Sequence, residues 1–340
     1  MNIKTNDYEI FDLGDIKLLS GKVLESAKLA YKTYGTLNAN CDNVVLLPTF
    51  YTGTHKRNEG FFGSGRAIDP NTHFIVSINM FGNGLSSSPS NTPPPHDGPH
   101  FPLITLWDNV ACQHRLLTEH LGVKHIALVT GWSMAGCQAY QWGAQFPDMV
   151  NAILPFCSSA KTSPHNFVFL EGVKSALCAD QNWMDGHYSS PPVKGLKAFA
   201  RVYAGWAFSQ TFYRKELYKK LGFNTIEDLL VDWENDHIKN WDANDLLAKL
   251  ATWQANDISF GPQYENDIKK ALRSIRARTI LIPCTQDLYF RHEDNLIEAQ
   301  QIPNVEIRPY DSPWGHCAAN PGNDLGFEVE LDKGINDLLN

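Results

Sequence analysis

The stretch VTGWSMAG, residues 129–136, is the most informative segment of this sequence. It differs from the pattern G-x-S-x-G only at Ala135, which stands where the second glycine belongs. A strand-like run at 125–132 leads into Ser133, and a helix-like segment at 134–147 follows it. In this context the pattern forms a tight strand-to-helix turn that exposes the serine. The stretch therefore predicts an α/β fold and a nucleophilic Ser133.

Short apolar runs bounded by turn signals recur on both sides of this stretch, as is typical of strands buried on both faces of a parallel sheet. They lie at 43–50, 73–80, 125–132, 150–157, 278–284 and 305–310. Helical patterns at 106–122 and 134–147 alternate with them. This alternation predicts a mostly parallel sheet flanked by helices.

The alternation stops between residues 161 and 270, where the sequence is helical and rich in aromatic residues. We expect residues 1–160 and 271–340 to form the core, with 161–270 as an inserted helical lid over the ligand-binding edge of the sheet. A separate helical domain is the alternative. The segment 86–102, rich in serine and proline, is expected to be either an ordered active-site loop or a flexible surface segment.

Composition narrows the class of protein. The 340 residues carry a net charge of −8, and scattered basic residues give no footprint for nucleic acid or an anionic membrane. No apolar run approaches the roughly 18 residues of a membrane span, and the N-terminus does not resemble a signal peptide. The seven cysteines show no C-x-x-C spacing, and cofactor motifs are missing. We therefore expect a cytoplasmic protein with a small-molecule substrate and neither metal nor cofactor.

Partners for Ser133 follow in the order Ser, Asp, His, each after a later strand. Asp287 comes just beyond the run at 278–284, and His316 lies in a glycine-containing loop after the run at 305–310. We expect His316 to take the Ser133 proton, and Asp287 to orient and stabilise the imidazole. Asp311 is the second choice for the acid; Glu293 and Asp294 are weaker alternatives, because neither directly follows a strand.

Two backbone N–H groups are expected to stabilise an oxyanion. Met134 supplies one at the start of the helix after Ser133. The other comes from Phe50 or Tyr51 in the loop 48–61, where Thr52 shapes the turn. An ordinary strand-end loop is the alternative for these residues.

With these residues in place, the chain resembles the homoserine O-acetyltransferase family of α/β-hydrolase-fold enzymes. The resemblance runs nearly end to end and is carried by the segments 30–47, 63–82, 101–123, 131–150, 179–188, 195–201 and 241–247, and by the Asp287 and His316 loops. These enzymes pass an acetyl group from acetyl-CoA through the serine to the homoserine hydroxyl. The resemblance supports the triad roles and implies a homodimer formed through the lid.

The chain departs from the family pattern around the acceptor. Trp132 and Ala135 replace two elbow glycines, and Phe208 replaces a tyrosine of the lid. Arg201 matches the arginine that binds the homoserine carboxylate, with a purely structural role as the alternative. Cys317 replaces the aspartate that pairs with the homoserine ammonium, and a buried ammonium without a carboxylate is costly. We expect homoserine to be a poor acceptor, and we expect the substrate pocket to contain Arg201, Trp132, Phe208, Thr52 and Cys317.

The expected functions share an acyl-Ser133 intermediate and differ in what attacks it. Apolar bulk from Trp132, Trp206 and Phe208 favours hydrolysis of an apolar or aromatic carboxylic ester, or of a lactone. The alternative is acyl transfer from acetyl-CoA or another acyl-CoA to a small hydroxyl acceptor other than homoserine. A non-catalytic binding protein is a remote alternative, because Ser133, Asp287 and His316 stand in the order that catalysis needs.

Overall fold

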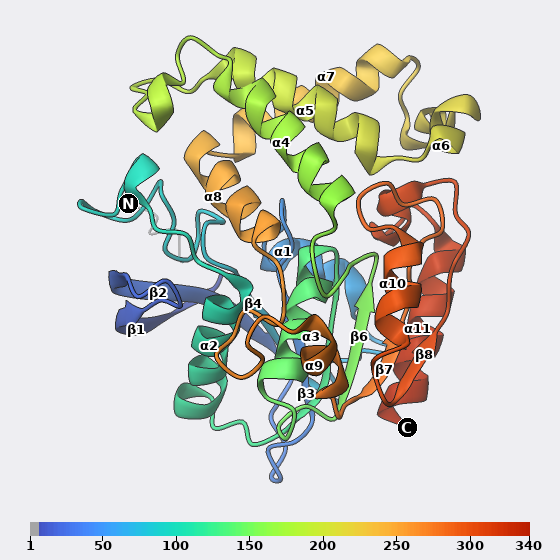
Figure 1. Cartoon of the computed structure of the whole chain (residues 1–340). Coiled ribbons are helices and arrows are strands. Elements are labelled where there is room, and N and C mark those ends of the chain that lie inside the picture. Colours follow the sequence, from blue (N-terminus) through green and yellow to red (C-terminus); the bar gives the residue numbers. More distant parts are fainter. Residues whose placement is uncertain (1–6) are drawn as a thin grey trace.

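Eight strands form one sheet in the order β1-β2-β4-β3-β5-β6-β7-β8, in a computed structural model that describes residues 7–340 (Figure 1). The parallel strands are β3 (Val44–Pro48), β4 (Phe74–Ile78), β5 (Ile126–Trp132), β6 (Ala152–Phe156), β7 (Arg278–Leu281) and β8 (Val305–Ile307). Each lies inside one of the six predicted runs. The predicted α/β fold with a mostly parallel sheet is confirmed.

Two N-terminal strands were not predicted. β1 (Glu9–Lys17) and β2 (Val23–Tyr34) pair antiparallel, and β2 continues the sheet by pairing antiparallel with β4. Exposed and buried residues are mixed along both strands, with charged side chains between the apolar ones. Such half-buried strands lack the continuous apolar run by which the other six were found.

Helices pack on both faces of the sheet. α2 (Leu106–Arg115) and α3 (Met134–Gln145) share one apolar core with one face, while α11 (Leu325–Leu339) shares a second core with the opposite face. Adjacent residues of β6 show the division, since Ile153 belongs to the first core and Leu154 to the second. Every residue of α3 is buried, so the helix that follows Ser133 is fixed along its whole length.

The helices above the carboxyl ends of the strands form the lid (Figure 1). We use that name for α4 (Pro164–Cys178), α5 (Val193–Ala207), α6 (Gln210–Arg214), α7 (Ile226–Asn240) and α8 (Ala243–Gln254). The segment after α8 returns to the core: Ile275 packs against Gly143 of α3, and α9 (Ile268–Arg273) contributes Ala271 and Leu272 to the same apolar cluster as α3. The helical lid therefore ends at Gln254 and not at residue 270, because the apolar side chains that follow Gln254 pack with the core.

The segment 86–102 is ordered and supports the lid from below. Ser86 Oγ accepts a hydrogen bond from Ala30 N, and Ser87 Oγ accepts one from Lys28 N, each at 2.9 Å. Ser90 donates to Asp245 of α8 through its N–H at 2.9 Å and its hydroxyl at 2.6 Å. The segment thus joins β2 to α8, and none of its residues lines the cavity described below.

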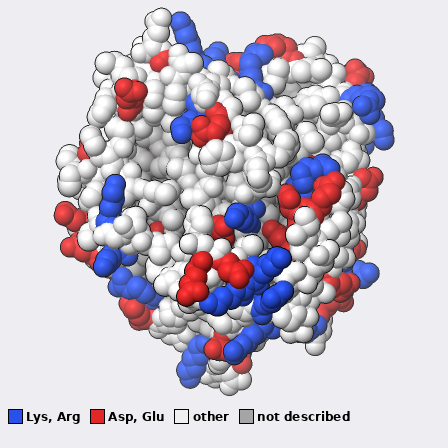
Figure 2. All heavy atoms as spheres, viewed as in Figure 1, with Lys and Arg blue, Asp and Glu red and all other residues white. Residues whose placement is uncertain are grey.

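The distribution of charged side chains on the surface does not favour one class of binding partner. Figure 2 shows acidic and basic side chains interspersed over one face of the molecule. Among the helices of residues 7–340, none combines the length and the apolar character that crossing a bilayer requires.

Candidate active site

Ser133 occupies the sharp turn between β5 and α3 and has backbone angles φ 60° and ψ −129°. This conformation is strained for a residue with a side chain, and such strain persists only where the surroundings enforce it. The enforcing contacts are present: Ser133 N donates to Phe156 O, and Cys137 N donates to Ser133 O, both at 3.1 Å. β6 and α3 therefore hold the serine in the pose expected of a nucleophile elbow.

Ala135 fits in place of the expected glycine because Gly131 has no side chain. A Cβ atom added to Gly131 would lie 2.4 Å from the Ala135 Cβ. The alanine methyl thus lies in the space that Gly131 leaves open. The turn needs one glycine at this contact and tolerates one methyl.

His316 lies in the short 3-10 helix Gly315–Ala319 and is held by Asp287. The distance from His316 Nδ1 to Asp287 Oδ2 is 2.7 Å, and a carboxylate partner places a proton on Nδ1. Asp287 is fully buried, and its other oxygen accepts backbone N–H groups of Tyr289 at 2.7 Å and Phe290 at 3.1 Å. These bonds fix the carboxylate and leave Nε2 of the imidazole to act as a base.

Asp311, the second choice for the acid, lies in a different network. Its carboxylate accepts hydrogen bonds from Thr285 Oγ1 at 2.5 Å and Gln286 Nε2 at 3.1 Å. Those bonds hold the pKa of the Asp311 carboxyl below its usual value. Asp287 is the acid that the fold places beside His316.

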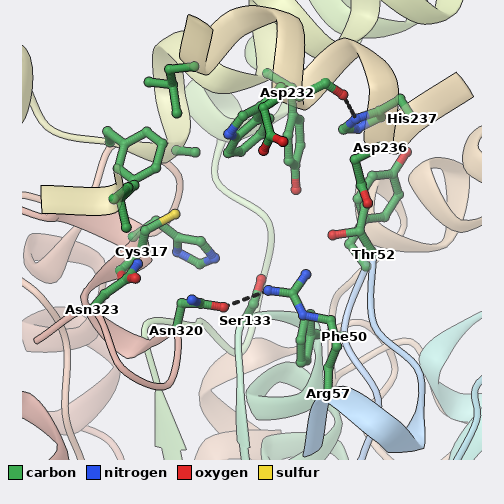
Figure 3. A pocket seen from close by; sticks show the side chains of 18 of the residues that line it. Phe50, Thr52, Arg57, Ser133, Asp232, Asp236, His237, Cys317, Asn320 and Asn323 are labelled. Carbon is green, nitrogen blue, oxygen red and sulfur yellow. Dashed lines mark hydrogen bonds between the residues drawn. The ribbon is translucent and has the colours of Figure 1, made fainter. Parts of the chain in front are cut away.

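One cavity of about 680 Å³ brings most of the predicted residues together. Figure 3 shows Ser133 and Arg57 at one end of the cavity, with Asp232 and His237 of α7 at the other. The lid therefore forms the roof of the cavity. The predicted residues on its wall are Phe50, Tyr51, Thr52, Trp132, Ser133, Phe208, His316 and Cys317.

Three backbone N–H groups are the oxyanion donors expected from sequence. Within residues 7–340, the N–H groups of Phe50, Tyr51 and Met134 donate to no other protein atom outside regular helix and strand bonding. Met134 is the first residue of α3, where an N–H has no partner inside the helix. Phe50 and Tyr51 line the same cavity as Ser133, so residues with unpaired N–H groups lie in the cavity that contains the serine.

Arg201 does not line the cavity, which corrects its expected place in the substrate pocket. It lies on α5, and its guanidinium forms ion pairs with Glu227 and Glu234 of α7. These pairs raise the pKa of Arg201 further above its usual value. Because two carboxylates already occupy the guanidinium, Arg201 joins two lid helices and takes the structural role that was the alternative.

Cys317 lines the cavity as an uncharged thiol. Burial raises the pKa of this thiol to about 12, so it carries no negative charge near neutral pH. It can contact an apolar part of a ligand but cannot pair with an ammonium group as a carboxylate does. Within the described residues, no group of three or more His, Cys, Asp or Glu side chains is arranged to hold a metal ion.

Several polar residues of the cavity wall were not identified from the sequence. The Arg57 guanidinium lies 5.1 Å from the centre of the Phe50 ring and donates to Asn320 Oδ1 at 2.5 Å. Asp232 and Asp236 reach the cavity from α7. These residues come from three distant segments without a shared motif, so only the folded chain identifies them.

A strained serine after β5, a histidine held by a buried aspartate after later strands, and this strand order together define an α/β hydrolase. The family model described as alpha/beta hydrolase fold matches residues 42–319, and the chain belongs to that family.

Full-length relatives include esterases and acetyltransferases. The chain is 36% identical to the ethyl acetate hydrolase of Pseudomonas veronii, covering 98% of this chain and 95% of that protein. The structure of the acetyl esterase MekB matches with a TM-score of 0.94 and 35% identity, covering 98% of this chain and 96% of the other. The homoserine O-acetyltransferase of Chlorobium chlorochromatii is 30% identical, covering 94% and 91%. The resemblance stated from sequence is confirmed.

Proposed function

We propose that this protein hydrolyses carboxylic esters, with acetyl esters of small alcohols as the substrate class, through an acyl-Ser133 intermediate. His316 Nε2 takes the proton of Ser133 Oγ as the oxygen attacks the ester carbonyl. The N–H groups of Met134 and of Tyr51 or Phe50 stabilise the oxyanion. His316 then protonates the departing alcohol. Water, deprotonated by the same imidazole, releases the acid and regenerates Ser133.

Two residues of the acceptor site favour water, and not the hydroxyl of an amino acid, as the group that attacks the acyl-Ser133 intermediate. Cys317 is neutral where an acetyltransferase of this family has the ammonium-binding aspartate, and Arg201 is occupied by Glu227 and Glu234. A homoserine-like acceptor would therefore lose both of its charged partners. A buried ammonium or carboxylate that loses its partner is destabilised by several kcal/mol, so the two changes disfavour the binding mode that the acetyltransferases use.

The proposed substrate class rests on two supports. The relatives at 36% and 35% identity are named as an ethyl acetate hydrolase and an acetyl esterase. The wall nearest the predicted nucleophile is aromatic, with Phe50 and Trp132 in contact at 4.8 Å between ring centres and Trp132 at 5.1 Å from His316. Such a wall suits an uncharged ester.

The test compares acetyl esters with and without acceptor alcohols. We expect purified protein to release acetate from ethyl acetate and p-nitrophenyl acetate in buffer alone. Ser133→Ala should keep the folded circular dichroism spectrum and lose at least about 1,000-fold in kcat/KM. A folded Ser133→Ala protein with wild-type turnover would refute the nucleophile.

The alternative function, acyl transfer, gives a different result in the same assay. It predicts that thiol release from acetyl-CoA depends strictly on an added alcohol, and that esters are not hydrolysed in buffer alone. The hydrolase proposal would then be wrong, while the acyl-Ser133 intermediate would remain.

A further inference from the structure

Lys249 is a fully buried lysine on α8 that lies directly behind the loop with the proposed oxyanion donors. Its Nζ donates to the carbonyl oxygen of Phe50 at 3.4 Å. The ammonium also lies over two aromatic rings, 4.8 Å from the centre of Trp241 and 5.5 Å from that of Tyr51. Neither the catalytic steps above nor the predicted pocket uses this residue.

The fold makes room for this side chain. A Cβ atom added to Gly82 would lie 2.9 Å from Lys249 Cγ, so the lysine stem passes through space that a glycine leaves open. Burying an amino group is unfavourable, and burial lowers the pKa of Lys249 to about 7. Asp245, one turn earlier on α8, is the acid that acts on it, and Asp245 is itself held by Ser90. The free-energy cost of burying the Lys249 amine suggests that the amine has a function or a stabilising contact.

The geometry of one peptide unit connects Lys249 to the site. The Phe50 carbonyl and the Tyr51 N–H belong to the same trans peptide and point in opposite directions. That carbonyl accepts hydrogen bonds from Gly53 N at 3.0 Å and from Lys249 Nζ at 3.4 Å. Two donors on the oxygen fix the plane of the peptide, and therefore fix where the Tyr51 N–H points.

The same helix holds the Tyr51 side chain. Its hydroxyl donates to the carbonyl oxygen of Leu246 at 2.8 Å, and Leu246 lies one turn before Lys249 on α8. Helix α8 thus contacts both the backbone of Phe50, through Lys249, and the side chain of Tyr51, through Leu246. A donor on a carbonyl also polarises its peptide, which strengthens the N–H on the other side as a hydrogen-bond donor.

We propose that Lys249 is a positioning residue which orients and polarises the Phe50–Tyr51 peptide, so that the Tyr51 N–H serves as the oxyanion donor. The proposal rests on the acyl-Ser133 chemistry proposed above, but not on the identity of the ester or of the acceptor. Lys249 itself touches no reacting atom. Its effect is expected only where negative charge develops on the substrate oxygen.

The test uses Lys249→Met, which keeps the length and apolar stem of the side chain and removes its donor. The first measurement is the rate at which a fluorophosphonate probe labels Ser133, since this reaction needs the oxyanion donors but no particular ester. Losing one oxyanion donor outright costs about 100-fold or more, so we expect this indirect loss to slow labelling about 10-fold. In ester hydrolysis, kcat should fall by the same factor while KM stays within about 2-fold, because the negative charge develops in the tetrahedral intermediate and its transition states and is absent from the bound ester.

Thr252→Val supplies the matched control. Thr252 is also buried on α8, but its hydroxyl donates to Ile104 O at 2.7 Å, away from the Phe50 turn. This variant should lose stability and keep the wild-type labelling rate. A Lys249→Met protein that is folded by circular dichroism and labelled at the wild-type rate would overturn the proposal. Lys249→Leu repeats the comparison if the methionine variant does not fold.

The outcomes separate this proposal from the hydrolase proposal. If the wild-type protein is labelled at Ser133 but hydrolyses no ester, the hydrolase proposal fails, and the labelling rates still decide the role of Lys249. If the wild-type protein is not labelled at Ser133, both proposals are wrong.

Discussion

Ser133 is held at a positive φ by backbone hydrogen bonds to Phe156 and Cys137, and the turn leaves no room for a side chain at Gly131, where an added Cβ would meet Ala135. Because Ala135 already places a methyl in this turn, the position of Gly131 must stay without a side chain. Ser133 supplies the chemistry that we propose, but Gly131 allows the strand and the helix to meet there.

Gly131→Ala tests this dependence. The new methyl would meet the Ala135 Cβ at 2.4 Å and its backbone at 3.0 Å, so we expect a loss of about 3 kcal/mol in the free energy of unfolding. Ala135→Gly alone should cost under about 1 kcal/mol, as expected for one alanine-to-glycine change in a helix. Urea denaturation measures both. In the double variant Gly131→Ala/Ala135→Gly, part of the loss should be recovered, and equal stability of the single Gly131→Ala variant and the wild type would contradict the interpretation.

Among the secondary-structure elements, the lid helices α5 and α7 are joined by ion pairs between residues that do not line the cavity. Glu234 of α7 is buried and forms ion pairs with Arg201 and Lys197 of α5. The matching arginine binds substrate in the resembled family, yet here the carboxylates of α7 hold it. Because Arg201 pairs with these carboxylates, it connects two lid helices and does not bind substrate as predicted.

Arg201→Ala distinguishes these roles. Because Arg201 lies outside the cavity, kcat and KM for p-nitrophenyl acetate should each stay within about 3-fold of wild type, and the free energy of unfolding should fall by about 1 kcal/mol. Steady-state kinetics and thermal denaturation measure the two effects. If the variant kept its stability while its KM rose by about an order of magnitude, Arg201 would return to the substrate site.

For the molecule as a whole, the buried amine of Lys249 makes folding depend on pH. Its pKa is about 7 in the folded protein, against an ordinary value of 10.5. Between these pH values the unfolded chain binds a proton that the folded chain has released, so the free energy of unfolding rises with pH. Below about pH 7 both states are protonated and the penalty of burial is complete.

Lys249→Met should therefore be more stable than wild type at about pH 6, and the difference should shrink as the pH rises toward about 10. Urea denaturation of the two proteins across this range measures the effect, and their difference cancels the groups that titrate equally in both. Thr252→Val should show no such dependence relative to wild type. Parallel stability curves for wild type and Lys249→Met would show that burial does not lower the pKa of this amine.

Three lid helices carry exposed apolar side chains, which dimerisation through the lid would bury. Val168 of α4 is 67% exposed, and Val202 of α5 and Val231 of α7 are 37% and 39% exposed. We predict a homodimer formed through the lid, with sedimentation velocity reporting the dimer mass. Val168→Asp should shift the protein toward the monomer, while the similarly exposed Val329→Asp on α11 should not; a wild-type monomer at micromolar concentration would refute the prediction.

Much of the fold could be predicted because its signals are local. Six strands are continuous apolar runs, and the elbow is a short pattern followed at once by its helix. β1 and β2 were missed because their apolar residues are interrupted by exposed charges. The predicted end of the lid lies too late in the chain, because α9 packs with the core. A helical sequence pattern does not show whether the helix packs with the lid or with the core.

Local sequence was enough for the fold class, the position of Ser133 and the order of Asp287 and His316, since each follows from a short run of neighbouring residues. The folded chain was needed to show that Arg201 pairs with α7, that Arg57 and Asn320 meet at the cavity, and that Lys249 lies behind the Phe50 carbonyl. These contacts join residues that are 33, 263 and 199 positions apart. The physical reason is that such contacts depend on which side chains lie close together in the folded chain. A local sequence pattern does not contain this information.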